Sequence, residues 1–130
     1  MTVDDFGAGS SPAQFDFARL ASISSGDAEF EREISGEYLA QSRQLLVQMA
    51  QAIASGDVAT LRRAAHTLKG SSRTIGAEGL GAISAELERK GGPESPAATT
   101  ANLARVEAGL AATERALDDY FGTDAYRKAA

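Results

Sequence analysis

Apolar residues recur at spacings of three and four along most of this chain, and only short polar stretches interrupt them. This pattern predicts amphipathic helices, and no segment has the alternating β-branched residues of a strand. The short breaks leave room only for turns, so helices that follow one another should run antiparallel. We therefore predict an all-α fold, an antiparallel up-down four-helix bundle with a short additional N-terminal helix.

Turn and capping residues mark the ends of the first three helices. A short first helix should cover residues 15–23 and end at the sequence SSGD. Asp27 is placed to cap a long second helix, because its carboxylate can accept the free N–H groups of the first turn. Residues 56–57, Gly-Asp, should end that helix and begin a third, which covers about residues 58–75.

The remaining breaks define two more helices. Gly76 should end the third helix, and a fourth should cover roughly residues 77–90. The stretch GGPESP at 91–96 predicts a loop, in which Ser95 and Pro96 suit the N-cap and first position of the last helix. The predicted core stripes of the second and last helices consist of Phe30, Ile34, Tyr38, Leu45, Met49, Ala52 and Ile53, and of Leu103, Val106, Leu110, Leu117, Tyr120 and Phe121.

The length of 130 residues suits one domain. Residues 1–14 combine Gly, Ser, Pro and Asp without periodicity, so we predict a flexible leader at 1–14 and the bundle at 15–125. No apolar run approaches the roughly 18 residues that would span a bilayer. The N-terminus also lacks the basic and apolar regions of a secretion signal. We expect a cytoplasmic protein that does not enter the membrane, and a monomer.

Two residue counts exclude much catalytic chemistry. The chain has no cysteine, which rules out disulfides, thiolate nucleophiles and cysteine metal sites, and its single histidine rules out a multi-histidine metal site. We therefore expect no metal site. The formal net charge of −5 also argues against a general nucleic-acid binder, which would need a broad basic surface.

The single histidine lies in the predicted third helix. With Leu61 placed at zero and about 100° per residue, Leu68 and Ile75 fall near the same line, which is the predicted buried face. His66 falls about 140° away from that line and should be exposed. Around it lies a local basic stripe, because no acidic residue occurs between Asp57 and Glu78. The stripe consists of Arg62, Arg63, Lys69 and Arg73.

The neighbours of His66 suit the handling of a phosphoryl group. Neutral imidazole is a competent nucleophile near pH 7, since its ordinary pKa of about 6.5 leaves a lone pair free. Lys69, one turn along, can balance the charge of phosphoryl oxygens. Gly70 removes a side chain next to the imidazole, so a partner surface could approach closely.

Several segments together resemble one family. HTLKGSS at 66–72, IGA at 75–77 and the pair Leu87–Glu88 are similar to the signature of histidine-containing phosphotransfer (HPt) domains of multistep phosphorelays. The resemblance extends upstream through FDFARL at 15–20, GDAEFEREI at 26–34 and SGDVATLRRAAH at 55–66.

The resemblance implies a helical bundle that relays phosphate without a nucleotide of its own. His66 would accept the phosphoryl group at Nε2 from a receiver-domain aspartyl phosphate and pass it to another receiver aspartate. Lys69 would face the phosphoryl group, and Gly70 would provide clearance. The implied partners are receiver domains of response regulators or of a hybrid histidine kinase, and Mg²⁺ would enter with the receiver. We expect Arg62, Arg63 and Arg73 to contact the partner.

A further candidate lies on the fourth helix. If the third and fourth helices form a hairpin that turns near residues 76–77, His66 falls opposite residues 87–88. Leu87 would face the core, and Glu88 could accept the Nδ1–H of the imidazole and hold Nε2 outward. A solvated carboxylate on the exposed rim is the alternative reading of Glu88.

Three other functions fit the same residues. The phosphoacceptor domain of a chemotaxis-type kinase would share this bundle but would receive phosphate from an ATP-dependent kinase domain. A helical adaptor would use the bundle without phosphoryl chemistry, and His66 would then be incidental. Binding of DNA through the basic stripe would rest on four charges of one helix, which give a small phosphate footprint.

Overall fold

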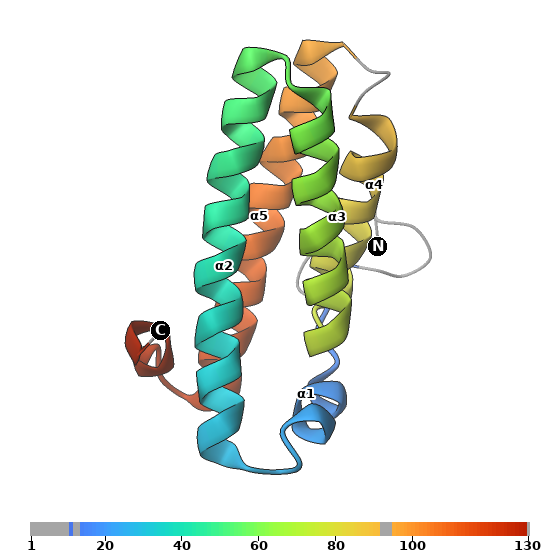
Figure 1. Ribbon diagram of the computed structural model, residues 1–130. Helices are drawn as coiled ribbons and strands as arrows, with labels where there is room; N and C mark the ends of the chain where they lie inside the picture. Colours follow the sequence, from blue (N-terminus) through green and yellow to red (C-terminus); the bar gives the residue numbers. More distant parts are fainter. Residues whose placement is uncertain (1–10, 12–13, 92–94, 130) are drawn as a thin grey trace.

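The computed structural model describes residues 11, 14–91 and 95–129, and this part of the chain contains helices and their connections but no strand (Figure 1). The helices are α1 (Phe17–Ile23), α2 (Ala28–Ser55), α3 (Val58–Ile75), α4 (Glu78–Lys90), α5 (Pro96–Phe121) and the 3₁₀ helix η1 (Ala125–Ala129). Most of the predicted leader lies outside the described residues. No helix in the described part of the chain is long and apolar enough to cross a bilayer.

The four long helices form the bundle that the sequence predicts. α3 packs against α2 and α4, and α5 packs against the same two helices, so the order around the bundle is α2, α3, α4, α5. Figure 1 shows successive helices running in opposite directions, with α1 at one end of the bundle. The prediction of a four-helix bundle with a short extra N-terminal helix is confirmed.

The predicted breaks and caps are present. The Asp27 carboxylate accepts two backbone N–H groups in the first turn of α2, and the Asp57 carboxylate accepts one in α3. Gly56 between these helices has a φ of 73°, in the left-handed region that glycine adopts without steric cost. Ser95 caps α5 with Pro96 in its first turn. Of the predicted loop at 91–96, residues 92–94 lie outside the described part of the chain.

Most of the predicted stripe residues are buried, but Phe30 is 43% exposed, so its placement in the core was wrong. Phe30 lies in the first turn of α2 and lines an open groove between α2 and α3, together with Ile23 and Ile34. A helix-periodic position is buried only where another element covers it, and the short α1 leaves this groove uncovered.

Tyr120 is also more exposed than predicted, at 42%, yet its ring is packed. It belongs to a chain of aromatic contacts at one end of the bundle, which we call the aromatic ladder. Phe15 stacks on Phe17 with ring centroids 4.5 Å apart, and Phe17 stacks on Tyr120 at 4.3 Å. Phe121 continues the ladder from Tyr120 at 5.1 Å to Tyr126 at 4.7 Å. The ladder thus joins segments from the two ends of the described chain.

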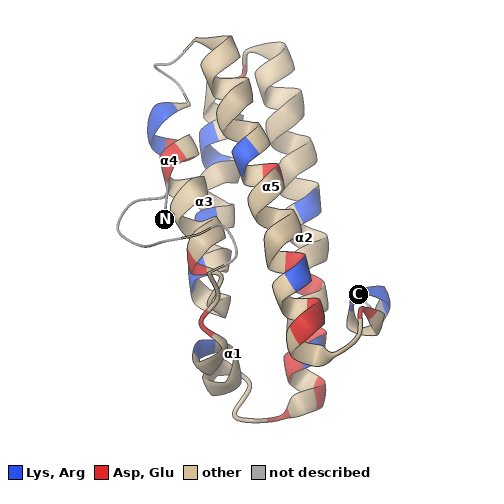
Figure 2. Cartoon of the chain, turned by 180° about the vertical axis from the view of Figure 1, so that it is seen from behind, with Lys and Arg blue, Asp and Glu red and all other residues tan. Residues whose placement is uncertain are grey.

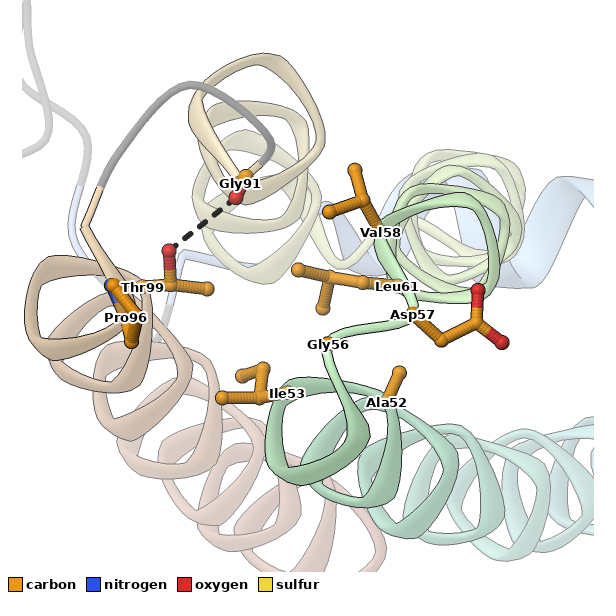
Figure 3. Close-up of a pocket in the computed structure, with 9 residues that line it drawn as sticks. All are labelled: Ala52, Ile53, Gly56, Asp57, Val58, Leu61, Gly91, Pro96 and Thr99. Atoms are coloured by element: carbon orange, nitrogen blue, oxygen red, sulfur yellow. Dashed lines mark hydrogen bonds between the residues drawn. The ribbon is translucent and has the colours of Figure 1, made fainter.

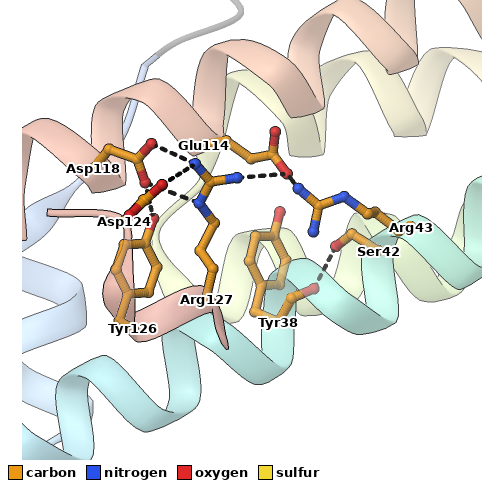
Figure 4. Close-up of polar contacts among 8 residues, drawn as sticks. All are labelled: Tyr38, Ser42, Arg43, Glu114, Asp118, Asp124, Tyr126 and Arg127. Carbon is orange, nitrogen blue, oxygen red and sulfur yellow. Dashed lines mark hydrogen bonds and ion pairs between the residues drawn. The ribbon is translucent and has the colours of Figure 1, made fainter. Parts of the chain in front are cut away.

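The helix η1 was not predicted. Tyr126 on it is buried against the bundle, and its hydroxyl donates to Asp118 over 2.7 Å. Arg127 donates from Nε and Nη2 to the two carboxylate oxygens of Asp118, and Glu114 lies between Arg127 and Arg43 (Figure 4). Burial, followed by the hydrogen bond to Asp118, raises the pKa of Tyr126. These polar contacts hold the C-terminal segment against α5 and α2.

A buried hydrogen bond joins α2 to α3 beneath the histidine helix. The hydroxyls of Tyr38 and Ser72 lie 2.6 Å apart, and both residues are buried. Burial raises the pKa of Tyr38 to about 12, so the phenol stays neutral and can share its proton in this bond. The neighbouring Ser71 hydroxyl instead donates within its own helix, to the Leu68 carbonyl over 3.3 Å.

Gly76 forms the tight connection between α3 and α4. Its φ is 108°, and its carbonyl accepts the Asp16 N–H over 2.7 Å. A Cβ at this position would lie 2.5 Å from the Asp16 carbonyl oxygen. The position therefore has both a left-handed backbone and no space for a side chain.

Substitutions of two glycines should change stability in opposite directions. Gly76→Ala should lower the free energy of unfolding by more than about 1 kcal/mol, because alanine is strained at this φ and clashes with Asp16. Gly70→Ala, in a helix interior with no atom near its Cβ position, should raise it by up to about 1 kcal/mol. Urea unfolding followed by circular dichroism measures both, and stabilisation by Gly76→Ala would contradict the proposed clash.

Candidate functional site

His66 lies on the outer side of α3, next to α4. Its side chain is 65% exposed, while Ala65 and Leu68 on the opposite side of the helix are buried. The burial of α3 thus matches the orientation expected from the helical angles. Gly76 and Ala77 turn the chain back into α4, which brings the last turns of α4 alongside His66.

Glu88 on α4 contacts the imidazole directly. Its Oε2 lies 2.9 Å from His66 Nδ1, so the contact expected from the hairpin register is present. In the neutral tautomer with hydrogen on Nδ1, this nitrogen donates to the carboxylate and Nε2 carries the free lone pair. Nε2 makes no hydrogen bond with the described residues. The solvated-rim alternative for Glu88 does not fit this geometry.

Lys69 also binds Glu88, which the sequence analysis did not anticipate. Lys69 Nζ lies 2.8 Å from Glu88 Oε1, so the two oxygens of one carboxylate hold the lysine and the imidazole. The hydrogen bond from Lys69, with a smaller contribution from that of His66, holds the pKa of Glu88 below its ordinary value. The sequence could have predicted this ion pair, because Lys69 lies one turn after His66 on the side of α3 that faces α4.

The three arginines of the basic stripe are exposed but differ in their contacts. Arg62 Nε donates to the backbone carbonyl of Glu88 over 3.2 Å, so its side chain crosses from α3 to α4. Arg63 Nη2 donates to the Thr60 hydroxyl over 3.3 Å within α3. The backbone carbonyl of Arg73 accepts from Arg19 of α1. Arg62 is therefore the arginine bound closest to the His66 and Glu88 pair.

Gly70 leaves open space beside the imidazole. It lies one turn after His66 on the exposed side of α3, and a Cβ built there would meet no atom within 4 Å. The absence of a side chain is therefore not required by packing within the chain. The position is free for a surface that approaches from outside.

The candidate site lies on the open surface of the bundle, next to a shallow groove between α3 and α4 that is lined by Arg62, Lys69 and Glu88. An apolar pocket of about 200 Å³ lies at the far end of the bundle, between the α2–α3 connection and the end of α4 (Figure 3), and none of the candidate site residues lines it. Among the described residues, no group of three or more acidic or histidine side chains could hold a metal ion. The chemistry available at this surface is that of His66 with its carboxylate and lysine neighbours.

Comparison with known proteins identifies the family. The family model of the Hpt domain matches residues 33–118, more than half of the chain, including α3, α4 and the candidate site. No curated protein and no solved structure matched in the corresponding comparisons. The chain therefore belongs to the Hpt domain family, whose members are phosphotransfer domains of two-component signalling and interact with receiver domains in phosphorelays.

Proposed function

We propose that His66 accepts a phosphoryl group from a receiver-domain aspartyl phosphate and passes it to the aspartate of another receiver. The observation that carries this proposal is an exposed imidazole whose Nδ1 is bound 2.9 Å from Glu88 while Nε2 is free. A nucleophile fixed in one tautomer and open on its reactive side needs no reorganisation before attack.

Transfer of the phosphoryl group to His66 needs no acid or base from solution. The Nε2 lone pair attacks the phosphorus atom, the P–O bond to the aspartyl oxygen breaks, and that oxygen leaves with the electron pair as a carboxylate. The proton on Nδ1 stays hydrogen-bonded to Glu88, which stabilises the positive charge that develops on the ring. Attack of the next receiver's aspartate on the phosphohistidine reverses these changes.

Lys69 would exchange partners during transfer. At rest it binds Glu88 at 2.8 Å, and its flexible stem allows the ammonium group to turn towards phosphoryl oxygens near Nε2. Glu88 would then be hydrogen-bonded only to the imidazole of His66. We propose that the chain itself uses no cofactor and that Mg²⁺ enters with the receiver, which supplies its own acidic pocket.

A direct phosphotransfer assay tests the proposal. Incubation with a phosphorylated receiver should label the chain with an acid-labile, base-stable phosphoryl group, and His66→Ala should abolish the label. The fold should survive this substitution because His66 is exposed. Label that persists in His66→Ala would exclude this site. Label obtained only with an ATP-dependent kinase domain, and not with any receiver, would favour the chemotaxis-type phosphoacceptor instead.

The clearance at Gly70 makes a separate prediction. Gly70→Gln should leave the melting temperature nearly unchanged or raised, since the position is exposed and uncrowded. It should slow phosphotransfer sharply, because the new side chain blocks the receiver. Lys69→Ala is the comparison, since it removes charge without a steric block. Normal transfer by Gly70→Gln would exclude the clearance role.

The role of Glu88 can be tested without a partner. Glu88→Ala should reduce the population of the Nδ1–H tautomer of His66, measured from the imidazole ¹⁵N chemical shifts at a pH where the ring is neutral. Glu86→Ala is the matched control, because Glu86 lies on the same helix but binds Arg105. Equal tautomer populations in the two variants would show that Glu88 does not orient the ring.

A further inference from the structure

The face of the bundle opposite His66 carries very few charges. Residues 38–55 of α2 and 96–113 of α5 contain only three charged residues, Arg43, Arg105 and Glu107, whereas charged residues make up 24% of the whole chain. Figure 2 shows these parts of α2 and α5 mostly in tan, with the acidic residues gathered towards the other end of α2. Arg105 binds Glu86 and so turns towards α4. Within these two stretches, the charged residues on the shared outer face of α2 and α5 are therefore Arg43 and Glu107.

The low charge is not explained by burial. Many residues of these two stretches are exposed, including Gln44, Val47, Gln48, Ala50, Gln51, Ala54, Ala101, Ala104 and Ala108. Val47 is 55% exposed, more than any other large hydrophobic side chain in the described residues. Protein interfaces are depleted of charged residues at their centres. The low charge of this face and its exposed Val47 are the two features that it shares with the centre of a protein interface.

A groove runs along this face between the two helices. Its lining is apolar, formed by Leu46, Val47, Ala50, Leu110 and Ala111, and three charged residues lie at its ends, Arg43, Glu107 and Glu114. The α2–α5 groove lies across the bundle from α3 and α4, since α2, α3, α4 and α5 follow one another around it. A partner bound there would leave His66 accessible.

The charges at the ends of the groove indicate which partner fits. Arg43 lies beside Glu114, and Glu107 lies about two helical turns away on α5, so these two residues occupy diagonally opposite corners. Glu107 is exposed and makes no ion pair with the described part of the chain. Arg43 is 48% exposed, and Glu114 has a second cation in Arg127 at 3.9 Å. Arg43 can therefore bind another carboxylate without leaving Glu114 unpaired.

We propose that the α2–α5 groove is a self-association surface on which a second copy of this chain docks. A two-fold axis can lie in the interface along the other diagonal of the groove, which runs from Glu114 to Ala50. This axis places Arg43 of each copy over Glu107 of the other copy. Val47 and Ala111 then form the apolar centre of the contact. This arrangement differs from the monomer expected from the sequence, because the exposure of Val47 becomes evident only in the structure.

The size of the face sets the expected affinity. Eighteen residues of helix extend about 27 Å, and two helices side by side, each about 10 Å in diameter, are about 20 Å wide, so they present a face of roughly 500 Å². This is below the roughly 800 Å² per partner of a standard interface, so the dimer should be weak and concentration-dependent. The free chain should therefore be a monomer when dilute and a dimer as its concentration approaches the millimolar range.

Sedimentation equilibrium of the full chain tests the apolar centre. The wild type should show a monomer–dimer equilibrium, and Val47→Glu should weaken it by roughly tenfold or more, because the dimer would bury a carboxylate at its apolar centre. Val58→Glu is the matched control: it makes the same change at another exposed valine, outside the groove and at a helix N-terminus that tolerates acidic residues. Circular dichroism should show the same helicity in all three. A wild type that stays monomeric at millimolar concentration would overturn the proposal, as would equal effects of the two substitutions.

A charge reversal tests the two-fold pairing. Glu107→Lys should weaken the dimer, because it places a cation over Arg43 in both symmetric contacts. Glu37→Lys is the matched control, since Glu37 is an exposed acid that lines the groove between α2 and α3 instead. Both changes lower the net negative charge equally, so general repulsion between copies should fall in both. Weakening confined to Glu107→Lys supports the pairing, and an unchanged or tighter dimer in Glu107→Lys excludes it.

Discussion

Burial of one face of α3 determines the position of the whole site. Leu61, Ala65 and Leu68 are almost completely buried between α2 and α4, and together they contribute several kcal/mol of hydrophobic stabilisation. A helix that buries this face can rotate very little, because each residue is fixed at about 100° from the next. His66 is thereby held at the surface on the α4 side. The exposure of the imidazole is thus a consequence of core packing and does not depend on any contact of the ring itself.

Glu88 is the second constraint on the site, because its one carboxylate binds both the imidazole of His66 and the ammonium group of Lys69. With Nδ1 and Nζ bound to different oxygens, the resting site has its positive lysine charge balanced before any phosphate arrives. A free lysine beside His66 would attract any small anion from solution, whereas a lysine that is paired must first leave Glu88. In the proposed phosphotransfer, this arrangement would favour a phosphoryl donor that is held in place by a docked partner over free phosphate.

The sequence predicts those features that depend on local periodicity and caps. The helix breaks at Gly56 and Gly76, the cap at Asp27 and the side of α3 that carries His66 all follow from such patterns, and the contact of Glu88 follows from counting residues back from one turn. Features that depend on how distant segments meet could not be predicted in this way. Whether Phe30 is covered depends on the length and placement of α1, and the docking of Tyr126 depends on Asp118 and on the path of the chain after α5. Counting residues back from the turn also places Lys69 near Glu88. The contact itself depends in addition on how far the long lysine side chain extends towards α4.

The aromatic ladder has a consequence for the order in which the molecule assembles. Its contacts between Phe17 and Tyr120 join segments about a hundred residues apart in sequence, and closing so long a loop is entropically unfavourable until the intervening chain is already compact. The hairpins of α2 with α3 and of α3 with α4 involve only neighbouring segments, which favours their early formation. The N-terminal helix should therefore join a bundle that already exists. By the same reasoning it belongs to the least stable cooperative unit of the native state, so amide hydrogen exchange in α1 should reflect local opening, while the buried face of α3 exchanges only on global unfolding.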